Sequence, residues 1–293
     1  VFAEFRAALR QRDLQEWADA FRGTTAYLCK NRASLPYRAV VVDETQDLAP
    51  GELKLIRALV PEGQNDLFLV GDAHQRIYGR RQTLKQCDIH VVGRSSRLRL
   101  NYRTTDEIRS WSTALLRDCP IDDLDGETDS DRGYMALLHG AKPEVRHFGS
   151  LKEELAFIVT RIKELLEADA AEHICLTART HHLLRADYAR ALDEAHIPFV
   201  ELDKQEESDA GEGVRLATMH RVKGLEYPHM LIAGINADAM PLHSILERTD
   251  DPGERAECEL RERCLLYVAA TRARDTLTVS HWGEASKFLP SQY

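Results

Sequence analysis

The chain of 293 residues carries 39 Lys+Arg against 48 Asp+Glu, a formal net charge of −9, with 43% apolar and 30% charged residues. These proportions are ordinary for a globular protein, and the length suggests about two domains. No apolar run approaches the roughly 18 residues of a membrane-spanning helix, so the sequence excludes a helical membrane protein.

The negative charge is concentrated in two segments. Residues 118–131 hold seven acids and no Lys or Arg, and residues 201–212 hold six acids and one Lys. These segments carry −12, so the remaining chain carries +3. We expect both to be solvated loops, and the first lacks the glycine placement of a calcium loop. A polyanionic partner is not excluded, because binding depends on local charge patches.

The six cysteines are scattered without a Cys-x-x-Cys pair, which favours reduced thiols in a cytoplasmic protein over a metal site. The first residues, Val-Phe-Ala-Glu-Phe-Arg, lack the pattern of a signal peptide. Since they also lack an initiator Met, we expect the sequence to be a segment of a longer chain.

Hydrophobic periodicity predicts an α/β protein. Residues 1–30 have helical spacing, and residues 38–72 have the order strand, helix, strand of a βαβ unit, which implies a parallel sheet. Further strands are predicted at 97–100, 144–148, 173–177, 198–202, 213–219, 230–235 and 276–280, with helices at 105–117, 152–168, 183–195 and 254–272.

Acidic residues follow the first predicted strand. Asp43 and Glu44 come directly after Val40–Val42, and the carboxyl ends of parallel strands are where open α/β sheets bind ligands. A nucleotide site needs one carboxylate for Mg²⁺ and one for the attacking water. The alternative at this point is an ordinary acidic loop. Gln75 follows the next strand, where a side chain can contact a terminal phosphate.

Five motifs occur in a fixed order between residues 43 and 274. They are Asp-Glu-x-Gln-Asp at 43–47, Gly-Asp-x-x-Gln-x-Ile-Tyr at 71–78, Asn-Tyr-Arg at 101–103, Thr-x-His-x-x-Lys-Gly-Leu-Glu at 218–226 and Tyr-Val-Ala-x-Thr-Arg-Ala at 267–273. In these motifs the sequence resembles the UvrD/Rep family of superfamily 1 helicases. The resemblance implies RecA-like parallel sheets with flanking helices, divided into part of a first motor domain (1–92) and a second motor domain (93–293).

The resemblance also implies roles in ATP hydrolysis. Asp43 would bind Mg²⁺, Glu44 would be the catalytic carboxylate, and Gln75 would contact the γ-phosphate. Arg103 and Arg272 would be arginine fingers that stabilise charge in the transition state. The alternative for Arg272 is a surface ion pair.

The remaining implied roles concern the nucleotide and the nucleic acid. Tyr102 would stack on adenine, Glu226 would contact the ribose, and Gly224 lies in the same nucleotide-binding motif. Single-stranded DNA would be contacted by a set from both domains: Tyr78, Arg80, Thr218 and His220. For Tyr78 and Tyr102 the alternative is core packing.

The sequence departs from the family pattern in three ways. Only 109 residues separate Arg103 from Gly213, which leaves little room for the large inserted subdomain that many relatives carry. No Gly-Lys-Ser/Thr occurs, so the amides and lysine that hold the β- and γ-phosphates are absent from these residues. Arg80 stands where the family usually has an aromatic residue, although arginine can also stack on bases.

We therefore expect the C-terminal portion of an ATP-dependent DNA helicase or translocase of 3′–5′ polarity, acting on single-stranded and duplex DNA. The missing N-terminal part of the same motor would be its partner, and this chain alone would not hydrolyse ATP. The alternative is a non-catalytic nucleic-acid-binding or regulatory module. A helicase–nuclease fusion finds no support, since 19 residues follow Arg274.

Overall fold

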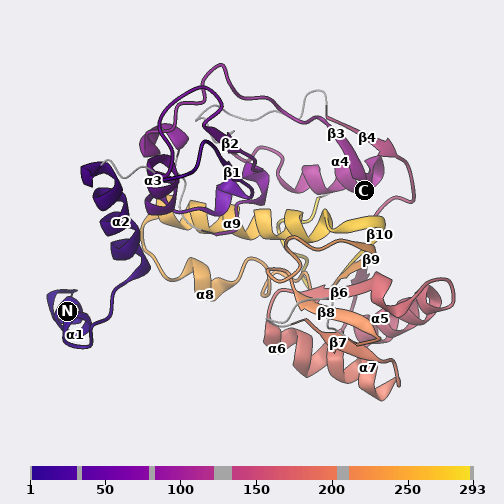
Figure 1. Ribbon diagram of the computed structural model, residues 1–293. Helices are drawn as coiled ribbons and strands as arrows, with labels where there is room; N and C mark the ends of the chain where they lie inside the picture. Colours follow the sequence, from indigo (N-terminus) through magenta and orange to yellow (C-terminus); the bar gives the residue numbers. More distant parts are fainter. Residues whose placement is uncertain (1, 32–34, 79–82, 122–133, 203–210, 291–293) are drawn as a thin grey trace. The chain divides into compact units, whose positions relative to one another are not determined.

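The computed structural model describes residues 2–31, 35–78, 83–121, 134–202 and 211–290. These residues form two compact units. The first spans Val1–Ser96 and takes in Ile121, and the second spans Arg97–Pro120 and continues from Ser130 to Tyr293. The α/β class predicted from the sequence, with parallel sheets and flanking helices, is confirmed (Figure 1).

The first unit is built on two parallel strands. Strand β1 (Val40–Val42) pairs with β2 (Leu67–Leu69), and the register places Val41 beside Phe68. Residues 1–30 form two helices instead of one. The helices of this unit are α1 (Phe2–Gln11), α2 (Trp17–Asn31) and α3 (Pro50–Ala58), with short 3₁₀ turns at Thr45–Asp47, Ala73–Gln75 and Leu84–Cys87.

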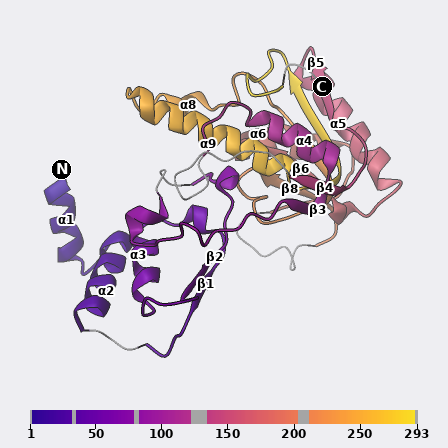
Figure 2. The same ribbon diagram turned by 90° about the horizontal axis from the view of Figure 1, so that it is seen from above.

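The two faces of this small sheet differ. One face packs on a core cluster, whereas Val41 and Phe68 on the other face are 73% and 64% exposed. Helix α2 packs on α3 (Figure 2). Both faces of the two strands are apolar, but among the described residues only one face is buried against a core cluster. The core cluster consists of Leu53, Leu84, Cys87 and Ile89.

A buried carboxylate anchors the start of β2. Asp66 is 4% exposed and forms an ion pair with Arg57 (Nη1 to Oδ2, 2.7 Å). The backbone N–H groups of Gly63 and Leu67 also donate to its oxygens, at 3.2 and 3.0 Å. Burial alone raises the pKa of Asp66, but the hydrogen bonds and charge of Arg57 and these amides outweigh it and lower the pKa to about 2.

Replacing Asp66 by Asn is expected to destabilise the first unit by about 1–3 kcal/mol, because Arg57 loses its buried partner. The pKa of Asp66 is lower in the folded state than its ordinary value of 3.8, so its contribution is complete above that value. The contribution is lost as the pH falls towards 2. Hydrogen exchange of the β1 and β2 amides measures both effects. The matched control Asp88→Asn removes an exposed carboxylate, and equal effects of the two variants would contradict this assignment.

The second unit contains a sheet of six strands in the order β5-β10-β9-β6-β8-β7, and every neighbouring pair is parallel. Parallel strands covered on both faces read as nearly continuous apolar runs, and all five residues of β6 and of β8 are buried. The strands are β5 (Glu144–Phe148), β6 (Ile174–Ala178), β7 (Phe199–Glu201), β8 (Val214–Thr218), β9 (Tyr227–Ile232) and β10 (Ala273–Trp282).

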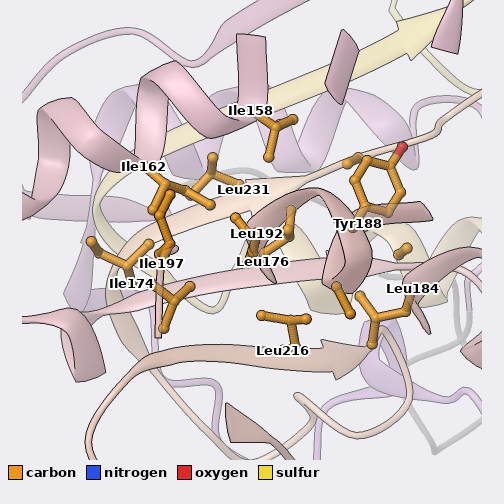
Figure 3. Close-up of a cluster of buried hydrophobic side chains, with 14 of the residues drawn as sticks. Ile158, Ile162, Ile174, Leu176, Leu184, Tyr188, Leu192, Ile197, Leu216 and Leu231 are labelled. Atoms are coloured by element: carbon orange, nitrogen blue, oxygen red, sulfur yellow. The ribbon is translucent and has the colours of Figure 1, made fainter. Parts of the chain in front are cut away.

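Helices cover both faces of this sheet (Figures 1 and 2). On one face α5 and the helical segment from His181 to Glu194 pack on β6, β8 and β9, and Figure 3 shows the apolar side chains that meet there. The other face carries α4 and α9, which also contact each other. The helices are α4 (Asp106–Leu115), α5 (Leu151–Leu166), α6 (His181–Leu183), α7 (Arg190–Glu194), α8 (His243–Leu246) and α9 (Pro252–Ala270), with a π-helical stretch at Leu184–Ala189.

Two further strands form a separate parallel pair in the second unit. Strand β3 (Leu100–Thr105) pairs with β4 (Met135–Leu138), and Leu100 lies beside Met135. The sequence predicted a strand that ends at Leu100, and β4 was not predicted. The observed strand instead begins there and contains the Asn-Tyr-Arg motif.

No helix of the described residues is both long and apolar enough to cross a membrane. The six cysteines are free thiols, three buried and three at least partly accessible.

Candidate functional site

The predicted acidic residues of the first unit lie at the carboxyl end of β1, beside the end of β2. The N–H of Val70 donates to the carbonyl of Val42 at 2.8 Å, and the N–H of Thr45 donates to the carbonyl of Val70 at 2.9 Å. The chain segments that follow the two strands are therefore held together. As a result, Asp43 and Glu44 share one sheet edge with the loop that carries Gln75.

Both carboxylates of this edge are exposed. The N–H of Glu44 donates to Asp43 Oδ1 at 2.8 Å, and Glu44 has a left-handed backbone with φ 51° and ψ 38°. Carboxylate oxygens suit Mg²⁺, which proteins usually hold through one or two carboxylates together with substrate phosphates. The two exposed carboxylates at one strand end fit that mode of binding.

The loop after β2 is organised by Asp72. Its Oδ1 accepts the N–H of His74 at 2.9 Å, and its Oδ2 accepts Nε2 of Gln75 at 3.0 Å. Burial raises the pKa of Asp72. The hydrogen bonds from His74, the charge of His74 and the hydrogen bond from Gln75 act in the opposite direction, and together they lower the pKa. Tyr78 is 45% exposed, so core packing does not explain it. Arg80 lies outside the described residues.

In the second unit the Asn-Tyr-Arg motif lies inside β3. Asn101 Oδ1 accepts the backbone N–H of Arg103 at 2.8 Å and that of Thr104 at 3.2 Å. Tyr102 is 69% exposed, so core packing is excluded for this residue as well. Arg103 Nε lies 2.7 Å from Glu226 Oε2, which brings two predicted nucleotide residues 123 positions apart into an exposed ion pair.

Glu226 and Arg272 precede neighbouring strands. The N–H of Tyr227 donates to the carbonyl of Arg272 at 2.9 Å, so both residues lie at the amino ends of β9 and β10. Gly224 has φ +83°, a left-handed conformation that favours glycine at this turn. The sequence placed Arg272 within a helix, but α9 ends at Ala270.

The side chain of Arg272 is buried, with 3% exposed. Its Nε donates to the carbonyl of Val268 at 3.2 Å, and its Nη1 donates to that of Leu225 at 3.4 Å. The alternative of a surface ion pair is therefore wrong. The guanidinium is therefore held by one carbonyl of α9 and one carbonyl of the turn before β9.

Thr218 and His220 lie at the opposite edge of the sheet: Thr218 is the last residue of β8, and His220 follows it by two residues. Thr218 is 6% exposed, and its carbonyl accepts the N–H of Arg221 at 2.9 Å, so it supports the turn that carries His220. Burial and the charge of Arg179 lower the pKa of His220, while Glu262 opposes them. The neutral imidazole is thereby favoured near neutral pH.

A buried ion pair stands behind this edge. Arg179, one residue after β6, donates from Nε and Nη2 to the two carboxylate oxygens of Glu262 in α9, at 2.9 and 2.7 Å. Both side chains are nearly inaccessible, at 6% and 5% exposed. The N–H of Leu242 adds a third donor at 3.2 Å. Such bidentate pairs fix geometry as well as charge.

Sequence reasoning assigned no role to three residues that organise these edges: Gln46, Arg179 and Glu262. Gln46 was part of a recognised motif, and Arg179 follows a predicted strand as Asp43 does. The positions of Gln46 and Arg179 in the sequence were the signals from which a role could have been predicted. The partner of Arg179 lies 83 residues away, and spacing alone gives no indication of such a pair.

Comparisons with known proteins were consistent with these motifs. The model described as the UvrD/REP helicase N-terminal domain matches residues 1–87, and that of the UvrD-like helicase C-terminal domain matches residues 200–284. The chain is 25% identical to DNA helicase IV of Escherichia coli (strain K12), over 99% of the chain and 40% of the relative. It is 32% identical to the ATP-dependent DNA helicase HMI1, mitochondrial, of Saccharomyces cerevisiae, over 58% of the chain and 25% of the relative.

Among solved structures, the C-terminal domain of a possible DNA helicase from Lactobacillus plantarum WCFS1 aligns with a TM-score of 0.45 at 18% identity, covering 64% of this chain and 92% of that one. The assignment rests on the sequence matches, since the two family models together cover more than half of the chain. The chain spans less than half the length of the curated relatives named here. From these matches, the chain belongs to the UvrD/REP family of helicases.

Proposed function

We propose that this chain supplies residues for ATP hydrolysis and DNA contact in an ATP-dependent DNA helicase or translocase that moves 3′–5′ on single-stranded DNA. The observation that carries the proposal is the hydrogen-bonded edge of the first unit, where Asp43 and Glu44 lie beside the loop that holds Gln75. Relatives of this chain are named ATP-dependent DNA helicases, which supports the same function.

In this proposal the first unit acts on the phosphates and on the attacking water. Asp43 holds Mg²⁺, which when bound neutralises charge on the phosphate oxygens. Glu44 orients the water and takes up its proton, because its carboxylate is exposed and is held by a hydrogen bond from Nε2 of Gln46. Gln75 contacts the γ-phosphate.

The second unit contributes charge and base contacts. Arg103 and Arg272 stabilise the transition state as arginine fingers, and Glu226 binds the ribose from the turn at Gly224. The exposed ring of Tyr102 stacks on adenine. The ion pair of Arg103 with Glu226 supports this grouping, since it places two of these side chains together on their own unit.

Single-stranded DNA is proposed to contact Tyr78 and Arg80 from the first unit and Thr218 and His220 from the second. Stacking of bases on an exposed aromatic ring contributes about 1–3 kcal/mol per base. Tyr78 has the exposure that stacking requires. We place the protein in the cytoplasm, in keeping with its six free thiols.

A second candidate function is a non-catalytic nucleic-acid-binding or regulatory module. The sequence favours it in one respect, since these 293 residues contain no Gly-Lys-Ser/Thr to hold the β- and γ-phosphates. In the preferred proposal that loop comes from an N-terminal part of the same motor.

The chain alone is expected to show no ATP turnover, with or without single-stranded DNA. A longer protein that joins it to a phosphate-binding segment should hydrolyse ATP, and Glu44→Gln should lower kcat there by about 10²- to 10⁴-fold. A phosphate-release assay on both proteins tests this. Turnover by the chain alone that Glu44→Gln abolishes would contradict the expectation, and DNA binding without turnover by the longer protein would favour the module.

A further inference from the structure

Gln46 bridges the two strand ends of the first unit. Its side chain is 6% exposed. Its Nε2 donates to Glu44 Oε2 at 2.5 Å, and its Oε1 accepts the backbone N–H of Asp72 at 3.0 Å. If the side-chain amide of Gln46 were flipped, its oxygen would face the carboxylate of Glu44 and its NH₂ group would face the backbone N–H of Asp72. The two partners therefore fix the orientation of the amide.

The bridge continues through Asp72. The backbone of Asp72 is bound by Gln46, while its carboxylate accepts Nε2 of Gln75 at 3.0 Å. Hydrogen bonds therefore run from the carboxylate of Glu44 through Gln46 and Asp72 to the amide of Gln75. The lowered pKa of Asp72, caused mainly by His74 against the effect of burial, keeps this carboxylate an acceptor.

The backbone of Glu44 needs such support. A non-glycine residue with φ 51° and ψ 38° lies in a sparsely populated region, and such conformations persist where their surroundings determine them. The side-chain bond from Gln46 and the N–H bond to Asp43 both act on this one residue.

We propose that Gln46 is a positioning residue that fixes the carboxylate of Glu44 relative to Gln75 for ATP hydrolysis. The inference rests on the proposed roles of Glu44 and Gln75. It adds that the two must be aligned with each other, and it assigns that alignment to one buried amide.

Two substitutions distinguish the hydrogen bond from Gln46 to Glu44 from the hydrogen bond between Gln46 and Asp72. Gln46→Leu removes both hydrogen bonds. Gln46→Glu keeps an acceptor for the Asp72 N–H but replaces the donor to Glu44 with a second carboxylate. The two carboxylates repel each other in Gln46→Glu, so Glu44 should lose its position in this variant while the bond to the Asp72 N–H is kept.

The measurements use the longer protein with its phosphate-binding segment for kinetics and the 293-residue chain for hydrogen exchange. Both variants should lower kcat by about 10- to 100-fold while KM for ATP changes much less. Exchange of the Asp72 amide should quicken in Gln46→Leu and stay slow in Gln46→Glu. The control Gln86→Leu removes a similar bond to the N–H of Thr83 away from this edge and should leave kcat unchanged.

Normal kcat in Gln46→Glu with slow Asp72 exchange would overturn the proposal, because Gln46 would then be needed only to hold the loop. An equal loss of kcat in Gln86→Leu would also overturn it. If the unsubstituted longer protein hydrolyses no ATP, the proposed function fails, and this inference fails with it.

Discussion

Replacing Arg272 by Ala is expected to lower kcat for ATP hydrolysis by about 10³- to 10⁵-fold in a protein that joins this chain to a phosphate-binding loop. KM for ATP should change much less, since an arginine finger acts mainly in the transition state. The side chain of Arg272 is 3% exposed. Its Nε and Nη1 are bonded to the carbonyls of Val268 and Leu225, so few rotamers are open to the side chain.

The same contacts require a control for folding. Arg272→Ala also removes the guanidinium bonds to the carbonyls of Leu225 and Val268, of which Val268 keeps the bond from the Thr271 hydroxyl, and this loss is expected to cost about 1–3 kcal/mol of stability. Arg103→Ala is the matched variant, because the ion pair of Arg103 with Glu226 is exposed and is worth about 0–1 kcal/mol. Steady-state kinetics with thermal unfolding of each variant separates the two effects. A folded Arg272→Ala protein with kcat within tenfold of the unsubstituted one would show that the wrong arginine was assigned.

Much of the fold follows from hydrophobic runs of the sequence. The strand at Glu144–Phe148 was predicted with its observed bounds, and the shared edge after β1 and β2 follows from their parallel order. The errors have physical causes. In β3 the polar residues Asn101 and Arg103 interrupt the apolar pattern, and the pairing with β4 is irregular between Asn101 and Thr105, where the Asn101 side chain accepts the N–H groups of Arg103 and Thr104. The short β4 follows the acidic segment and has no β-branched residue.

The candidate site was less predictable than the fold. Motifs identified residues on two edges of the second unit, but they did not indicate that Arg103 pairs with Glu226 or that Arg272 lies after its helix. Those facts depend on how β3, β9 and β10 come together. Buried partners such as Glu262 are equally hard to find, because a glutamate in a charged helix is ordinarily solvated.

Replacing Glu262 by Ala should be among the most destabilising single changes in the second unit, at about 3–5 kcal/mol, since it leaves the buried charge of Arg179 without its partner. For a unit of this size the Tm should fall by roughly 10 °C. Glu194→Ala is the control, because the pair that it breaks with Arg190 is exposed at both ends and contributes little. Thermal unfolding of both variants gives the comparison, and similar Tm values would contradict it.

The pair should also be visible at His220. Burial and Arg179 lower the pKa of this histidine and Glu262 raises it, so Glu262→Gln should lower the pKa further, whereas Arg179→Met should raise it. Because the folded pKa lies below the ordinary value of 6.5, His220 favours folding above that pH and loses this contribution as the pH falls. NMR titration of the imidazole measures the shifts. Equal values in both variants would mean that the ion pair exerts no field on His220, and its role would then be confined to joining β6 to α9.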